Sequence, residues 1–216
     1  MSPDEYCQQK AAQSGSSFYY SFLFLPAERR RAITALYAFC REVDDTVDEC
    51  TEVGIARTKL HWWRSEIGAM LAGTPTHPVT LALQPHMATY QLDGQHLLAI
   101  IDGMEMDLDQ TRYLDYIGLQ KYCWHVAGVV GILSASIFGY TDKQTLQYAE
   151  QLGLAFQLTN IIRDVGEDAR IGRIYLPVNE LQQFGVTAAD LLNARHNEQF
   201  ENLMRFQVHR AQAAYD

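Results

Sequence analysis

Cysteine is scarce in this sequence and is not arranged for metal binding or cross-linking. The four cysteines are Cys7, Cys40, Cys50 and Cys123, and none belongs to a Cys-x-x-Cys pair. Zinc sites and disulfide frameworks both depend on closely spaced or numerous cysteines, so neither kind of site is indicated. Reduced thiols are typical of cytosolic proteins, and we expect a cytoplasmic location.

Basic charge and long apolar runs are also in short supply. The net charge is −9 at pH 7, which argues against a nucleic-acid partner because phosphate backbones are bound by basic patches. The polar N-terminus lacks the apolar core of a secretory signal. The longest apolar run, Val126–Tyr140, falls short of the ~20 residues that cross a bilayer, so no membrane-spanning helix is expected.

A third absence is the alternating pattern of β-strands; apolar residues recur instead with the helical period. Hydrophobic residues make up 48% of the 216 residues, enough for a sizeable core. The sequence therefore predicts one all-α domain over residues 1–216, a helical bundle with its sites between facing helices. Because the last helical pattern still runs at Tyr215, we expect the domain to be truncated at its C-terminus.

The helix boundaries follow from capping residues, prolines and glycines. Helices are expected within 4–23, then over 26–49, 53–71, 93–108, 114–138, from 141 or 142 to about 170, and from 187 onward. Loops are expected at Gly73–Pro78 and Arg170–Pro177. Gly139 suits a helix end, and Thr187–Asp190 resembles a capping box for the last helix.

Two of these predicted helices carry polar residues along one narrow face. The first face holds Tyr37, Arg41, Asp44 and Asp48, with Asp45 beside them. An acidic helix segment is usually a solvated face, and the arginine in it usually forms a weak surface ion pair. Here apolar residues surround the segment, and an arginine one turn before a carboxylate can also bind a phosphate oxygen.

The second polar face has nearly the same layout: Gln157, Asn160, Asp164 and Asp168, with Arg163 beside them. Two such faces brought together would form a cage of oxygen ligands. Mg²⁺ prefers a few carboxylates together with substrate phosphates, so the repeated pattern indicates chemistry on a diphosphate. Gly166 costs about 1 kcal/mol in a helix interior. It suggests a close backbone approach, or else a loosened helix end.

One further segment, Tyr122–Ser136, has two features with alternative interpretations. Small residues at Ala127, Gly128, Gly131, Ser134 and Ala135 could open a channel for a long apolar chain, and tight helix packing explains them equally well. His125, in the same segment, is interpreted as a structural histidine because no second metal ligand is indicated near it.

Two further segments of the sequence contain arginines. The segment Arg173–Pro177 follows the second polar face and is interpreted as a flap that closes over phosphates, the alternative being an ordinary loop. The run Arg29–Arg31 is interpreted as a solvated face, with a patch facing acidic lipid as the alternative.

Four segments together resemble the squalene/phytoene synthase family, in the family's order and over nearly the whole chain. They are the opening segment Ser14–Pro26, the first aspartate-rich motif Ala35–Asp48, the central motif Tyr122–Gly131 and the second aspartate-rich motif Gln157–Asp168. The opening segment and Asp102–Leu108 look most like the bacterial presqualene diphosphate synthases of the hopanoid route.

The resemblance implies a bundle of the isoprenoid synthase type with a central cavity. It also implies head-to-head joining of two farnesyl diphosphates to presqualene diphosphate. In the family's pattern, Asp44, Asp48, Asn160, Asp164 and Asp168 would hold Mg²⁺, with three ions around the bound diphosphate. The phosphates would be contacted by Arg41, Arg163, Arg173 and Tyr175. The reacting centre would be lined by Tyr37, Tyr122 and Gln157. The substrate would also be bound by Ser17, Phe18, Ala127, Gly128 and Gly131.

The same resemblance implies a peripheral contact with the inner membrane face, because the substrate is amphiphilic, and downstream squalene-pathway enzymes as partners. No NADPH site is indicated, since there is no glycine-rich dinucleotide turn. Sibling enzymes that make squalene, dehydrosqualene, phytoene or hydroxysqualene are the nearest alternatives. A non-catalytic assembly factor is a more distant one, because such a protein would be expected to lose aspartates that are all present here.

Overall fold

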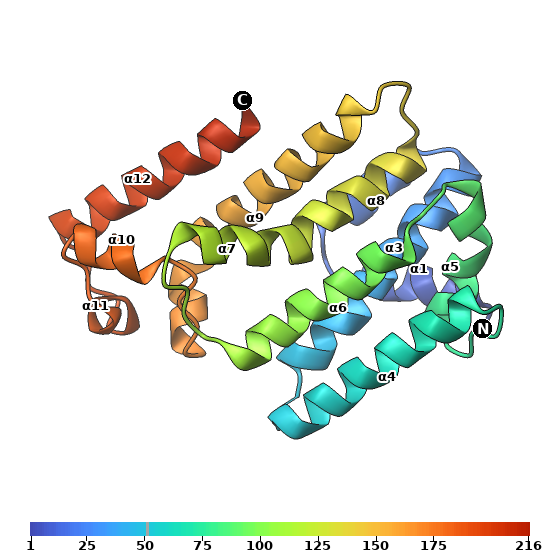
Figure 1. Ribbon diagram of the computed structural model, residues 1–216, viewed down its shortest axis with the longest axis horizontal. Helices are drawn as coiled ribbons and strands as arrows, with labels where there is room; N and C mark the ends of the chain where they lie inside the picture. The colour runs from blue at the N-terminus through green and yellow to red at the C-terminus, as the bar shows by residue number, and fades with distance from the viewer. Residues whose placement is uncertain (51) are drawn as a thin grey trace.

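The computed structural model describes residues 1–50 and 52–216, and it is a bundle of helices (Figure 1). Over these residues the only β pairing is one isolated bridge between Arg112 and Ile174, which confirms the all-α class. The elements are α1 (Pro3–Gln13), α2 (Ser17–Phe22), α3 (Ala27–Asp48), α4 (Val53–Leu71), α5 (Pro78–Thr89), α6 (Gly94–Asp109), α7 (Tyr116–Cys123), the π-helical turn η1 (Trp124–Gly128), α8 (Val129–Phe138), α9 (Gln144–Arg170), α10 (Val178–Gln183), α11 (Ala188–Leu192) and α12 (Glu198–Tyr215).

Several boundaries lie where local sequence signals placed them. Helix α3 starts directly after Pro26, and α4 matches the expected range. The Asp93 side chain accepts a hydrogen bond from the Gln95 N–H and caps α6. Gly139 ends α8 with a φ of +84°, a conformation that favours glycine.

The first expected helix, within 4–23, is in fact two helices. Gly15 has a φ of +66° and breaks the segment between α1 and α2. The hydroxyl of Ser14 donates to the Ala11 carbonyl, and that of Ser16 accepts from the Phe18 N–H, so each hydroxyl satisfies a helix end.

Helices α5 and α10 were not expected from the sequence. Pro85 inside α5 discourages a helix assignment, yet α5 buries Val79 and Leu83 against the core. The capping box at Thr187 is real, but it caps the short helix α11. The last helix, α12, begins at a separate cap, where Asn197 accepts from the Phe200 N–H at 2.9 Å.

The expected helix 114–138 contains the π-helical turn η1, which separates α7 from α8. By length and hydropathy alone the run Tyr116–Phe138 could cross a membrane. In the bundle this run is a central element, because η1 packs against both α6 and α9. A core helix of this composition gives the same hydropathy signal.

The core has two parts that meet at α6, η1 and α9. One is centred on α3, with the fully buried side chains of Leu36, Phe39 and Leu60. The other lies under α9, α10 and α12 and includes Leu158, Leu176 and Leu203. Figure 1 shows α9 and α12 side by side at one edge of the bundle and α4 at the opposite edge. Helix α3 packs against α6 and α8, whereas α9 packs against η1 and α8.

Candidate active site

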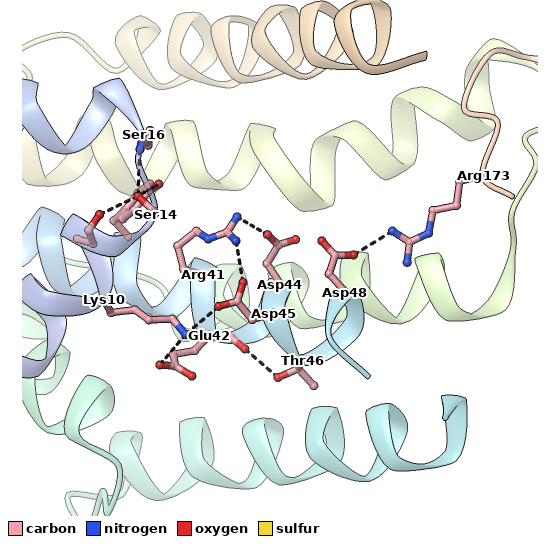
Figure 2. A network of polar contacts seen from close by, with 12 residues as sticks. Lys10, Ser14, Ser16, Arg41, Glu42, Asp44, Asp45, Thr46, Asp48 and Arg173 are labelled. Atoms are coloured by element: carbon pink, nitrogen blue, oxygen red, sulfur yellow. Dashed lines mark hydrogen bonds and ion pairs between the residues drawn. The ribbon is translucent and has the colours of Figure 1, made fainter. Parts of the chain in front are cut away.

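The first polar face lies on α3, and an ordered chain of ion pairs holds its side chains (Figure 2). Arg41 donates from Nη1 to Asp44 Oδ2 at 2.5 Å and from Nη2 to Asp45 Oδ1 at 2.7 Å. Lys10 of α1 pairs with the other oxygen of Asp45 at 2.8 Å and with Glu42 at 3.2 Å. The helical spacing places the pairs locally, and α1 adds a cation from outside the motif.

Tyr37 is hydrogen-bonded to the opening segment Ser14–Pro26. Its hydroxyl donates to Ser14 Oγ at 3.0 Å, so the turn at Gly15 sits directly over the first polar face. Ser17 and Phe18 are exposed on α2, and the Phe18 ring packs edge-on against Phe156 of α9. The opening segment therefore spans from the α3 face to the α9 face.

The second polar face lies on α9. Arg163 donates from Nε and Nη2 to the two oxygens of Asp164, both at 2.6 Å, in a bidentate pair. Within the described residues, the side chain of Asp168 has no hydrogen bond or ion pair. Gln157 and Asn160 are half-buried on the same helix.

The segment expected to be a flap contacts the first polar face. Arg173, in the loop after α9, donates from Nη1 to Asp48 Oδ1 at 3.0 Å, and Figure 2 shows it reaching that carboxylate at the end of α3. Burial and repulsion by Asp48 raise the pKa of Asp44 to about 6, although Arg41 lowers it. Burial and the adjacent Asp164 likewise raise the pKa of Asp168 to about 6, although Arg173 lowers it. Each polar face thus carries carboxylates that repel one another, Asp44 and Asp48 on α3 and Asp164 and Asp168 on α9.

This donor set fits Mg²⁺ that is bound together with a phosphorylated ligand. Among residues 1–50 and 52–216, no three Asp, Glu, His or Cys side chains converge closely enough to hold an ion by themselves. Carboxylates that raise one another's pKa are relieved by a cation, and Mg²⁺ usually takes only one or two carboxylates plus phosphates. The residues that would hold it are Asp44, Asp48, Asn160, Asp164 and Asp168.

A buried acid that the sequence analysis did not select lies near both polar faces. Asp107 of α6 is 8% exposed and accepts hydrogen bonds from the hydroxyls of Tyr122 at 2.8 Å and Tyr175 at 2.9 Å. The two rings stack with centroids 5.2 Å apart. Its spacing in the sequence could have indicated a buried acid. Asp107 follows Met104 by three residues and Ile100 by seven, which places it on the buried face of α6.

At Gly131, the small residue of the central motif allows two helices to pack closely. A Cβ added there would lie 2.2 Å from the backbone oxygen of Ala149, so α8 and α9 touch through their backbones. Gly153 of α9 is equally close to η1, because a Cβ added there would lie 2.4 Å from the Ala127 carbonyl oxygen. Gly128 borders a cavity of about 310 Å³ between α7, η1 and α9. Substrate contact by Ala127, Gly128 and Gly131 stays a prediction.

His125 and Gly166 are two single residues whose roles were interpreted from the sequence. His125 packs on Trp124, and its Nδ1 lies 2.8 Å from the Lys121 carbonyl oxygen, as expected of a structural histidine. The prediction of a close backbone approach at Gly166 was wrong for the residues that the structure describes. A Cβ added at Gly166 would meet none of their atoms within 4 Å, leaving aside its chain neighbours and the backbone of its own helix.

Sequence comparison places the chain among known proteins. The family model described as squalene/phytoene synthase matches residues 11–216. The chain is 39% identical to phytoene synthase from Arthrospira platensis, covering 98% of this chain and 72% of that protein. It is 37% identical to the chloroplastic phytoene synthase 1 of Arabidopsis thaliana, covering 97% of this chain and 51% of that protein. The chain thus spans about half of the plant protein.

Solved structures give the same family. The squalene synthase HpnC from Alicyclobacillus acidocaldarius is 31% identical, with a TM-score of 0.90, covering 98% of this chain and 80% of that one. A dehydrosqualene synthase determined with a ligand is 29% identical, with a TM-score of 0.91, covering 99% of this chain and 74% of that one.

Proposed function

Because the chain belongs to the squalene/phytoene synthase family, we propose that it carries the centre for Mg²⁺-dependent head-to-head condensation of two prenyl diphosphates. Members of the family are prenyltransferases that condense two such substrates. The observation that supports the proposal is the position of Arg173, which donates to Asp48 of the first polar face and lowers the pKa of Asp168 of the second. A diphosphate with its metal ions is the ligand whose charge the carboxylates of the two faces complement.

The reaction requires an allylic diphosphate to leave as a highly charged group. Bound Mg²⁺ would neutralise the diphosphate and stabilise it as it departs. Arg41, Arg163 and Arg173 are each held against a carboxylate, from which a guanidinium can turn to a phosphate oxygen. The arginines would thereby bind and orient the leaving group.

The organic part of the substrate is left as a carbocation that water must not reach. Tyr122 is buried and its ring stacks with that of Tyr175. Aromatic rings of this kind can stabilise a positive charge that forms nearby. The 2,3 double bond of the second substrate attacks C1 of the cation, and loss of a proton closes a cyclopropane. Bringing the two reactive carbons together supplies most of the entropic advantage.

Two farnesyl diphosphates, giving presqualene diphosphate, are the proposed substrates. The opening segment Ser14–Pro26 and the segment Asp102–Leu108 support this choice, and so do the structures named squalene synthase and dehydrosqualene synthase. A second candidate is the condensation of two geranylgeranyl diphosphates to phytoene. It is favoured by the phytoene synthases at 39% and 37% identity.

Mass spectrometry of the products tests both proposals. The purified protein is incubated with Mg²⁺ and either farnesyl or geranylgeranyl diphosphate, with and without NADPH. A C30 cyclopropyl diphosphate that persists with NADPH supports the first proposal, and phytoene from the C20 substrate supports the second. No coupled product from either substrate would overturn both. An Asp44→Asn, Asp164→Asn double variant is the inactive control.

We also propose a peripheral membrane contact at the end of α2. Phe24 is 91% exposed, Tyr20 and Leu23 are exposed beside it, and Arg30 reaches the Leu23 carbonyl from α3. Exposed apolar side chains beside an arginine suit the surface of an anionic bilayer. Sedimentation with phosphatidylglycerol vesicles at low salt tests this. Phe24→Glu should weaken binding relative to Arg195→Glu, which changes charge on the remote segment after α11.

A further inference from the structure

Asp107 is a buried carboxylate whose hydrogen bonds come from two tyrosines on different elements. Tyr122 belongs to α7 and donates to Oδ2 at 2.8 Å, and Tyr175 belongs to the loop after α9 and donates to Oδ1 at 2.9 Å. No ion pair to Asp107 occurs within 4.0 Å among the described residues. A buried acid without a paired cation is costly, so its place at this point in the bundle requires an explanation.

Asp107 is close enough to both polar faces for its charge to act on their carboxylates. Its charge contributes to the raised pKa of Asp44 on α3 and to that of Asp168 on α9. Arg173, which holds Asp48, also acts electrostatically on Asp107. The three-residue group of Asp107, Tyr122 and Tyr175 therefore lies near the polar faces where the diphosphate would depart.

The direction of the hydrogen bonds defines what Tyr122 can do. Its hydroxyl hydrogen is given to Asp107, so the lone pairs of the phenol oxygen are free to accept. A neutral phenol is a weak base by itself. It becomes an effective acceptor if its own proton moves to a neighbouring carboxylate as the new proton arrives.

We propose that Asp107 receives, through Tyr122, the proton that is lost when the cyclopropane closes. In this relay a C–H bond of the cationic intermediate breaks, and its electron pair forms the ring bond. The proton bonds to the Tyr122 oxygen while the original hydroxyl proton of Tyr122 passes to Asp107 Oδ2. Tyr122 is neutral before and after, and Asp107 ends as a carboxylic acid. The inference rests on the proposed function.

Asp107 acts through Tyr122, so it is a positioning residue and Tyr122 is the catalytic residue. Tyr175 binds the other carboxylate oxygen and fixes the orientation of Asp107, with a ring stacked on that of Tyr122. The hydroxyl–hydroxyl distance between the two tyrosines is 3.5 Å, so Tyr175 competes little for the Tyr122 proton.

The test compares Asp107→Asn, Tyr122→Phe and Tyr175→Phe, using substrate carrying deuterium at C1. Asp107→Asn keeps the shape of the side chain but cannot take up the proton. The relay predicts that coupled product falls about 10²- to 10⁴-fold in the first two variants, as general-base removal usually costs. It also predicts a primary isotope effect larger than that of the wild type for Asp107→Asn, and a smaller loss of activity for Tyr175→Phe.

Asp102→Asn is the matched control, because Asp102 is on the same helix, is half-exposed and pairs with Arg64 outside the site. It should leave both rate and isotope effect unchanged. Release of prenyl alcohol from a single substrate reports ionisation and should persist in Asp107→Asn. A normal rate and isotope effect in Asp107→Asn would overturn the relay and leave released diphosphate as the base.

Folding is checked separately by circular dichroism. If Asp107→Asn does not fold, the activities of Tyr122→Phe and Tyr175→Phe test the relay. Equal losses of activity in these two variants would overturn it. A wild-type protein without any coupled product would instead refute the proposed condensation itself.

Discussion

Arg173 and Asp48 are 125 residues apart in sequence and are joined by a hydrogen-bonded ion pair of 3.0 Å. Arg173 belongs to the loop that follows α9, and Asp48 is the last residue of α3. The pair is the direct polar bridge between the loop after the second aspartate-rich motif and the end of the first. A ligand that binds Asp48 through a metal would free the arginine for a phosphate oxygen.

We expect Arg173→Ala to lower kcat/KM by about 10²-fold, because a positioned cation at a developing charge contributes on this scale. Arg173→Lys should restore part of the activity, since lysine keeps the charge but not the planar fork. Steady-state kinetics with the confirmed substrate gives the values. Arg195→Ala, which removes an exposed arginine paired with Asp190, is the control. Equal activity of Arg173→Ala and the control would refute a phosphate-binding role.

Mg²⁺ with inorganic diphosphate should stabilise the protein more at pH 7.5 than at pH 5. The pKa values of Asp44 and Asp168 are raised to about 6 by burial and neighbouring carboxylates. Their protonated forms are favoured by folding, so these groups make the metal-free protein less stable as pH rises from about 4 to about 6. Over the same range their ionisation makes metal binding stronger.

Thermal unfolding at the two pH values measures this effect. At a ligand concentration of about 100 times Kd the stabilisation is about 2.7 kcal/mol. Asp168→Asn should reduce it, and Asp102→Asn should not. The same stabilisation at both pH values would contradict the assignment of these carboxylates as ligands.

Glu66→Gln should lower the free energy of unfolding by about 1–3 kcal/mol, the usual effect of disrupting a buried charged hydrogen-bond acceptor. Burial alone would raise the pKa of Glu66. Hydrogen bonds from the His77 N–H, the Thr80 hydroxyl and the N–H and hydroxyl of Thr76 nevertheless lower it to about 2. Since the folded pKa is depressed, this contribution is present above pH ~4.5 and lost as pH falls toward 2.

Urea denaturation of Glu66→Gln at pH 7 and pH 3 measures the loss. The difference from the wild type should shrink at the lower pH. Glu105→Gln removes a partly exposed ion-pair partner of Arg57 and Arg64, and it should cost less than about 1 kcal/mol. If the free energy of unfolding of Glu66→Gln is no lower than that of Glu105→Gln, other contacts hold the loop that contains Thr76 and His77.

Gly131→Ala should destabilise the fold by about 1–3 kcal/mol, as overpacking of a core does. The added Cβ would meet the backbone oxygen of Ala149, which cannot move aside without shifting α9. Gly166→Ala is the matched control, because its Cβ would point into open space within a helix. It should stabilise by about 0.4–1 kcal/mol. Thermal unfolding of both variants decides, and a Gly131→Ala protein of normal stability would argue against backbone contact between α8 and α9.

The two polar faces and their helices could be predicted because they depend on short-range geometry. Carboxylates four residues apart share a helix face whatever the rest of the chain does. Pro26, Asp93 and Gly139 likewise act on their own backbone neighbours, and their helices begin or end where expected. Helix α5 was missed for the same reason, since Pro85 is a local signal against a helix that packing overrides.

Tertiary structure decided which of these side chains meet. Asp107 is bound by Tyr122 and Tyr175 because α6, α7 and the loop after α9 converge, and no spacing in the sequence predicts that convergence. Lys10 joins the first polar face only because α1 packs on α3. The sequence by itself determined the composition of each face through helical periodicity. The contacts between faces depend on long-range packing, in which every element constrains the others.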